Sequence, residues 1–178
     1  MIKLFNDVSY YNAVKDACLN VFKIKEVKMI ELASHIVDLS LEHKKYICHL
    51  QLQKITYYTV LQGLKLNLID KSTLEELYKY KSDRFAPSRY GPRSEAIFLR
   101  YCVFGAERIF TNSFSSSYLR NMDFSHLNPI ILPLLEEQTM DLCRKSMKNP
   151  IFEERFKDNK EFSIEDIFEL SEKYSDLK

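Results

Sequence analysis

Side chains that could bind a partner gather between Lys79 and Arg100. This segment carries six basic and two acidic residues, a net charge of +4, and four of the basic residues are arginines. The planar guanidinium group of arginine suits paired hydrogen bonds to carboxylates or phosphates. A basic loop with aromatic neighbours can bind an acidic protein surface or a phosphate backbone. The candidate contacts in this segment are Arg84, Arg89, Tyr90 and Arg93.

The alternative is that this segment is a solvated face. Residues 151–178 carry nine acidic and five basic side chains, a net charge of −4. The whole chain has a net charge of only +1. Two faces of opposite charge can therefore neutralise each other in part, and the basic segment then needs no partner.

Catalytic and metal-binding patterns are absent from the sequence. The nucleophile elbow, the zinc-protease helix, the P-loop and the dinucleotide-binding glycine pattern do not occur. The histidines are scattered, and adjacent carboxylates such as Glu136 and Glu137 point apart on a helix. The cysteines form no closely spaced pair of the zinc-binding kind, so we expect reduced, mostly buried thiols at Cys18, Cys48, Cys102 and Cys143. We therefore expect no enzyme activity, no catalytic residue, no metal and no cofactor.

A short loop inside the basic segment carries the strongest turn signals of the chain. It reads Phe85-Ala-Pro-Ser-Arg-Tyr-Gly-Pro92, in a sequence with only three glycines and five prolines. Glycine tolerates positive φ and proline fixes φ, so Gly91 and Pro92 predict a structural turn. This turn either serves the fold alone or also presents Arg89 and Arg93 to a partner.

A second polar group lies about thirty residues upstream, in Leu52-Gln-Lys-Ile-Thr-Tyr-Tyr58. Gln51, Lys54 and Tyr58 are three and four residues apart, which places them on one face of a helix. A buried tyrosine hydroxyl normally finds a hydrogen-bond partner. One reading is that Tyr57 and Tyr58 anchor the loop through its backbone. The other is that one of them lines a groove for a partner, which makes Tyr58 the fifth candidate contact.

The elements that must position these residues are predicted to be helical, because apolar side chains recur with helical spacing. The expected helices begin near Asp7, cover residues 29–41, 50–64, 72–80, 94–104 and 129–147, and begin again at Ser163. The helix over residues 50–64 is apolar nearly all round, which is typical of a central, buried helix. Residues 112–117 read as a polar surface loop. A short strand or hairpin near residues 82–92 is the one expected exception to helix, since Phe85 and Tyr90 suit extended structure.

Local signals indicate where several helices begin and end. Ser72–Glu75 and Ser163–Asp166 resemble capping boxes. Gly63 and Gly105 are candidate left-handed caps at helix ends. Pro133 falls in the first turns of the helix over residues 129–147, where proline is best tolerated.

Length and composition favour one compact, mostly α domain over residues 1–178. We expect a helical bundle of about seven to eight helices, with residues 1–25 as an added N-terminal helix. The hydrophobic fraction of 46% and the charged fraction of 29% are ordinary for a globular protein. The longest apolar runs fall well short of the roughly 18 residues of a membrane span, and the N-terminus lacks the apolar run of a signal peptide. We therefore expect a cytoplasmic protein that does not insert into membranes.

Three segments resemble the Panacea domain family. Leu50-Gln-Leu-Gln-Lys-Ile-Thr-Tyr-Tyr58 is similar to the family's "L-K-L-Q-K-L-L-Y-Y" helix. Phe85–Pro92 is similar to its "F-x-A-W-x-Y-G-P" turn, with Ser88 where the family usually has an aromatic residue. Residues 149–166 resemble its "P-W…I-S-x-E-x-I" ending, with Phe152 in place of the tryptophan. The resemblance spans roughly residues 30–175.

This resemblance implies a small, helical, non-enzymatic protein that binds a toxin and neutralises it. Members similar to the SocA proteolytic adaptor and antitoxin deliver their partner to a protease, and phages and mobile elements often carry them. The expected partner is thus a toxic protein. One alternative is a phage or mobile-element inhibitor of a host defence effector. A second is a nucleic-acid-binding regulator that uses residues 79–100, which a steep dependence of binding on salt would distinguish.

Overall fold

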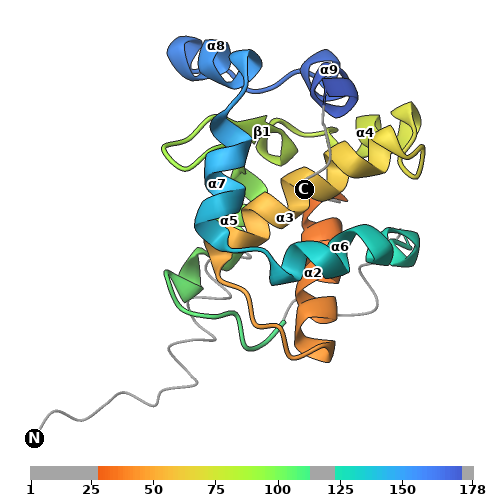
Figure 1. Ribbon diagram of the computed structural model, residues 1–178, viewed down its shortest axis with the longest axis vertical. Helices are drawn as coiled ribbons and strands as arrows, with labels where there is room; N and C mark the ends of the chain where they lie inside the picture. Colours follow the sequence, from red (N-terminus) through yellow and green to blue (C-terminus); the bar gives the residue numbers. More distant parts are fainter. Residues whose placement is uncertain (1–27, 113–122, 174–178) are drawn as a thin grey trace, which may run out of the picture.

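The computed structural model describes residues 28–112 and 123–173. This part of the chain contains eight α-helices, α2 to α9, and one two-stranded ladder (Figure 1). The expected mostly α fold is confirmed. The expected helices near Asp7 and over residues 1–25, and nearly all of the loop over residues 112–117, lie outside the described residues.

Helix α3 (His49–Lys65) runs through the centre of the fold (Figure 1). Every residue from Leu52 to Leu61 is buried, including the polar ones. Helices α2 (Lys28–Glu42), α6 (Asn128–Glu136), α7 (Thr139–Met147) and α9 (Ile164–Lys173) all pack against it. The apolar positions on every side of α3 are therefore explained by neighbours on every side, as the sequence predicts.

The long helix expected over residues 129–147 is wrong, because α6 and α7 are separate helices. Glu137 and Gln138 between them have extended backbone, with ψ of 144° and 132°. The Gln51 side-chain amide donates a hydrogen bond to the Glu137 carbonyl oxygen at 3.0 Å. A carbonyl outside the helix thus has a partner on α3, which offsets the hydrogen bonds that the break removes. Pro133 lies inside α6.

Two of the predicted helix ends are also wrong. Helix α4 (Lys71–Leu77) is capped by Asp70, whose carboxylate accepts the Thr73 N–H at 2.7 Å, and not by the box at Ser72. Helix α3 continues past Gly63, and the positive φ of 55° falls on Asn67. A Cβ at Gly63 would lie 2.6 Å from Ile69 Cδ1, so this glycine serves a close packing contact instead.

The hairpin expected near residues 82–92 is confirmed. A 3-10 turn, η1 (Lys81–Asp83), leads into β1 (Phe85–Ala86), which pairs antiparallel with β2 (Arg93–Ser94). Helix α5 (Glu95–Tyr101) follows at once, capped by the Ser94 hydroxyl. It continues into η2 (Cys102–Phe104) and ends at Gly105, as the sequence predicts, but the ψ of −123° at Gly105 lies outside the left-handed helical region, so the predicted left-handed cap is wrong.

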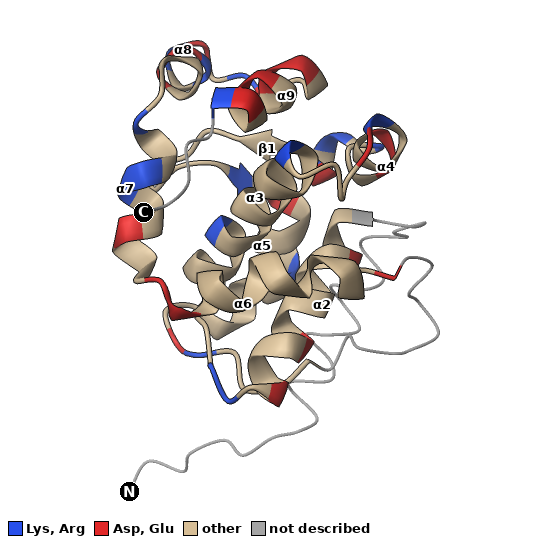
Figure 2. Ribbon diagram, turned by 45° about the vertical axis from the view of Figure 1, so that its right-hand side comes forward, with Lys and Arg blue, Asp and Glu red and all other residues tan. Residues whose placement is uncertain are grey.

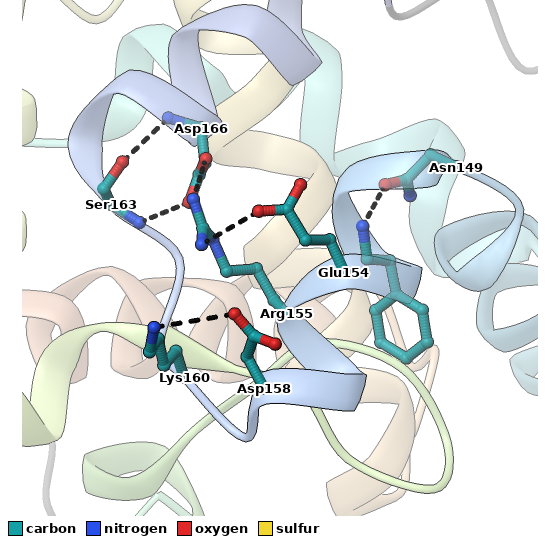
Figure 3. A network of polar contacts seen from close by, with 8 residues as sticks. Asn149, Glu154, Arg155, Asp158, Lys160, Ser163 and Asp166 are labelled. Atoms are coloured by element: carbon teal, nitrogen blue, oxygen red, sulfur yellow. Dashed lines mark hydrogen bonds and ion pairs between the residues drawn. The ribbon is translucent and has the colours of Figure 1, made fainter.

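The C-terminal part of the described chain is held together by a polar network between α8 (Pro150–Asp158) and α9 (Figure 3). Arg155 makes two hydrogen bonds to the Asp166 carboxylate, at 2.7 and 2.9 Å. The Ser163 N–H donates to the Asp166 carboxylate at 2.8 Å, and the Asp166 N–H donates to the Ser163 hydroxyl oxygen at 3.1 Å, which confirms the capping box. This joint fixes α9 relative to α8, since two-pronged arginine–carboxylate pairs also fix orientation.

The acidic C-terminal part lies beside the hairpin. The Phe162 N–H donates to the Phe85 carbonyl oxygen at 2.8 Å, which extends the edge of β1. Lys81 and Glu161 form an ion pair at 3.3 Å next to it. Acidic and basic residues are interspersed along α8 and α9 (Figure 2). Within the described residues, every helix is too short or too polar to span a bilayer.

Candidate functional site

Two side chains of helix α3 form hydrogen bonds to the backbone of the hairpin of β1 and β2. Gln53 uses both ends of its amide: its nitrogen donates to the Ser94 carbonyl oxygen at 3.0 Å, and its oxygen accepts the Ser94 N–H at 2.9 Å. The side chain therefore pairs with β2 much as another strand would. Gln53 is a residue that sequence analysis missed, because a polar side chain on a central helix carries no signal of its backbone partner.

Lys54 occupies the next position and is fully buried. Its Nζ donates to the Pro92 carbonyl oxygen at 2.5 Å, and no carboxylate of the described residues lies within ion-pair distance of it. Burial lowers the pKa of Lys54 from 10.5 to about 7; the Cys143 thiol opposes that shift, and Arg93 adds to it. An amine inside the protein and next to no carboxylate is costly in its charged form.

The turn itself fits tightly between Lys54 and α7. Gly91 has a φ of +93°, and a Cβ built there would lie 2.2 Å from Ser146 Oγ and 3.1 Å from Lys54 Nζ. Its N–H donates to the Ser88 carbonyl oxygen at 3.0 Å, and the Ser88 hydroxyl donates to the Gly91 carbonyl oxygen at 2.6 Å. Both backbone geometry and space therefore require glycine here. Ser88 closes the turn through these two hydrogen bonds.

The Tyr58 side chain does not lie on the surface. It is 2% exposed, and its hydroxyl donates to the Leu142 carbonyl oxygen on α7 at 3.1 Å. Tyr57 is buried as well and packs edge-on against Phe85, with ring centroids 5.2 Å apart. Tyr58 thus anchors α7 rather than the loop. A buried ring cannot touch a partner of the folded domain, so Tyr58 leaves the set of candidate contacts.

The four remaining candidate contacts differ in how far they are free to bind. Arg89 and Tyr90 are exposed at the end of the turn, where the guanidinium lies 5.7 Å from the ring centroid. Arg84 is exposed and bonds the Tyr78 carbonyl oxygen at 3.4 Å. Arg93 is engaged within the chain: it pairs with Glu95 at 2.7 Å and stacks over Phe98 at 4.5 Å. Arg84 and Arg89 have no carboxylate partner among the described residues.

Two titratable groups near the hairpin were not singled out by sequence analysis. His49 packs against Phe98, and burial together with the charges of Arg93 and Lys54 lowers its pKa from 6.5 to about 4. The Asp83 side chain has no exposed surface, and neither of its carboxylate oxygens has a hydrogen-bond partner. Burial raises the pKa of Asp83 from 3.8 to about 7. Single charged residues in sequence give no warning of such burial.

The cysteines and the other metal-binding residue types form no site in residues 28–112 and 123–173. No group of three histidine, cysteine or carboxylate side chains there could hold a metal ion. Cys48, Cys102 and Cys143 are free thiols, and Cys18 lies outside the described residues. Only Cys143 of these three is buried, so the expectation of mostly buried thiols is wrong for Cys102, which is exposed on η2.

No family model, curated protein or solved structure matches this chain. The site must therefore be interpreted from its geometry. A turn fixed by buried hydrogen bonds exposes Arg89 and Tyr90, and Arg84 is exposed directly before β1. This arrangement can bind a surface rich in carboxylates.

Proposed function

We propose that this chain is a non-enzymatic protein-binding module that neutralises a toxic protein by stoichiometric binding, as an antitoxin does. Delivery of the bound protein to a protease is a variant of the same role. The observation that carries the proposal is the turn, which is held by Gln53, Lys54 and Ser88 while Arg89 and Tyr90 are exposed. The toxin as partner class comes from the resemblance to the Panacea family.

Two physical reasons support protein binding at this turn. A loop whose backbone is already fixed loses little conformational entropy when a partner binds. Tyrosine and arginine are enriched among the residues that dominate the binding energy of protein interfaces. Because Arg84 and Arg89 lack carboxylate partners in the described part of the chain, the complementary partner surface is acidic.

Nucleic-acid binding has weaker support from the same residues. Recognition of a phosphate backbone needs several cations that are free to pair with phosphates. Two of the six cations in residues 79–100, Lys81 and Arg93, already pair with Glu161 and Glu95. An inhibitor of a host defence effector would use the same exposed surface, and the identity of the partner decides between it and an antitoxin.

Co-expression with the partner tests this proposal. The partner is first captured from the native host with the tagged chain and identified by mass spectrometry, and then expressed with each variant while growth is measured. Arg89→Glu should lower partner recovery at least tenfold and abolish rescue, because like charges at an interface cost several kcal/mol. Lys157→Glu, an exposed charge reversal on α8, is the matched control and should behave as the parent chain.

Both variants should keep the helical circular dichroism spectrum of the parent. Full rescue by Arg89→Glu would place the interface elsewhere. Recovery of nucleic acid in place of a protein, with affinity that falls log-linearly with salt, would favour the regulator.

A further inference from the structure

Lys54 is a buried titratable group that stability alone does not explain. Its side chain is fully buried on the most enclosed helix of the described fold. An ammonium group has three N–H donors, yet Lys54 has one hydrogen-bond acceptor, the Pro92 carbonyl oxygen. An apolar side chain of similar length would fill the same space without placing an amine inside the protein. Buried polar groups that break the usual rules of a core are found mainly at functional sites.

The position of the amine indicates what it does. Nζ lies 2.5 Å from the Pro92 carbonyl oxygen and would lie 3.1 Å from a Cβ at Gly91. These two residues directly follow the exposed pair Arg89 and Tyr90. In the described part of the chain, Lys54 is the one side chain that bonds the Pro92 carbonyl oxygen. Gln53 bonds the backbone of Ser94, two residues further along.

We infer that Lys54 is a positioning residue for the binding turn: its buried amine holds the Pro92 carbonyl so that Arg89 and Tyr90 stay in one outward arrangement. This inference rests on the proposed binding role of the turn. The depressed pKa of Lys54 agrees with it, because the fold tolerates an amine whose charged form burial disfavours. The role of Lys54 is thus local order at the turn and not global stability.

Hydrogen exchange tests this without a partner. Amide exchange is measured by NMR on the parent chain, on Lys54→Met and on Lys65→Met, an exposed lysine on the same helix. In Lys54→Met we expect the Gly91 amide, which bonds the Ser88 carbonyl, to exchange at least tenfold faster. Amides in the middle of α3 should keep their protection, and the melting temperature should be unchanged or higher. Lys65→Met should leave the Gly91 amide as it is.

Each other outcome overturns the inference. Unchanged exchange at Gly91 would mean that the turn is held without Lys54. Faster exchange throughout α3, a lower melting temperature or failure to fold would mean that Lys54 supports the whole core. None of these results depends on a partner, so the inference can fail while Arg89→Glu still abolishes rescue, and the proposed function can fail while Lys54 still orders the turn.

Discussion

Gly91 offers the sharpest test of how the turn is built, because two separate effects act against a side chain there. Its φ of +93° disfavours any residue other than glycine, at a cost of about 1–3 kcal/mol. A Cβ would also lie 2.2 Å from Ser146 Oγ, and relieving such an overlap in a packed site costs typically about 1–3 kcal/mol. Gly91→Ala should therefore lower the free energy of unfolding by roughly 2–6 kcal/mol.

A double-mutant cycle separates the two effects. Ser146→Ala removes the hydroxyl oxygen at 2.2 Å and leaves Ser146 Cβ at 3.4 Å from the added Cβ, an ordinary contact, and the end of the Lys54 side chain at 3.1 Å. Gly91→Ala should then cost about 1–2 kcal/mol less in the Ser146→Ala background than in the parent. Gly105→Ala is the matched control, since Gly105 has a φ of +53° with no atom within 4 Å of an added Cβ. Its cost should be backbone strain alone, unaffected by Ser146→Ala.

Urea denaturation followed by circular dichroism gives the free energies for all of these variants. The α3–turn–α7 packing is refuted if Gly91→Ala and Ser146→Ala are additive, or if Gly91→Ala costs no more than Gly105→Ala. Ser146 donates a hydrogen bond to the Cys143 carbonyl oxygen within its own helix, so Ser146→Ala alone should cost about 1 kcal/mol or less.

Three further predictions concern the buried polar groups. The folded chain loses the Lys54 proton near pH 7, whereas the unfolded chain keeps it up to about pH 10.5. The free energy of unfolding should therefore rise by up to about 2 kcal/mol between pH 7 and 9. Urea denaturation at each pH should show that Lys54→Met abolishes this rise. Asp83 acts in the opposite sense: the folded chain keeps its proton up to about pH 7, so its contribution is present below about pH 4 and is lost as the pH rises to 7. Asp83→Asn should therefore raise the stability at pH 8 relative to that at pH 4, and a parallel shift at both pH values would contradict this. Tyr58→Phe should cost about 1 kcal/mol by removing the hydrogen bond from its hydroxyl to the Leu142 carbonyl oxygen, whereas Tyr90→Phe, at an exposed ring, should leave the melting temperature unchanged.

Much of the helical layout was predictable because it follows from local periodicity. Apolar side chains spaced for a helix place α2 and α3 nearly at their observed bounds, since a buried helix needs apolar positions wherever it has neighbours. The box at Ser163 and the helix end at Gly105 were also predicted, because each signal lies within a few positions of the helix end it marks. Local sequence signals did not predict features that depend on a residue from another helix. The break between α6 and α7 carries a hydrogen bond from Gln51, which lies on another helix.

The candidate site also has features that local sequence predicts and features that depend on tertiary packing. The sequence alone determined that a turn lies at Gly91–Pro92 and that cations surround it, because turn residues and charge are local properties. Only the tertiary structure decided that Tyr58 is buried, that Lys81 is paired with Glu161, and that Lys54 and Gln53 bond the turn from α3. Burial and pairing depend on which segments far apart in the chain come together. Whether a polar side chain faces solvent, a carboxylate or a backbone carbonyl is therefore decided by packing, and spacing in the sequence does not record it.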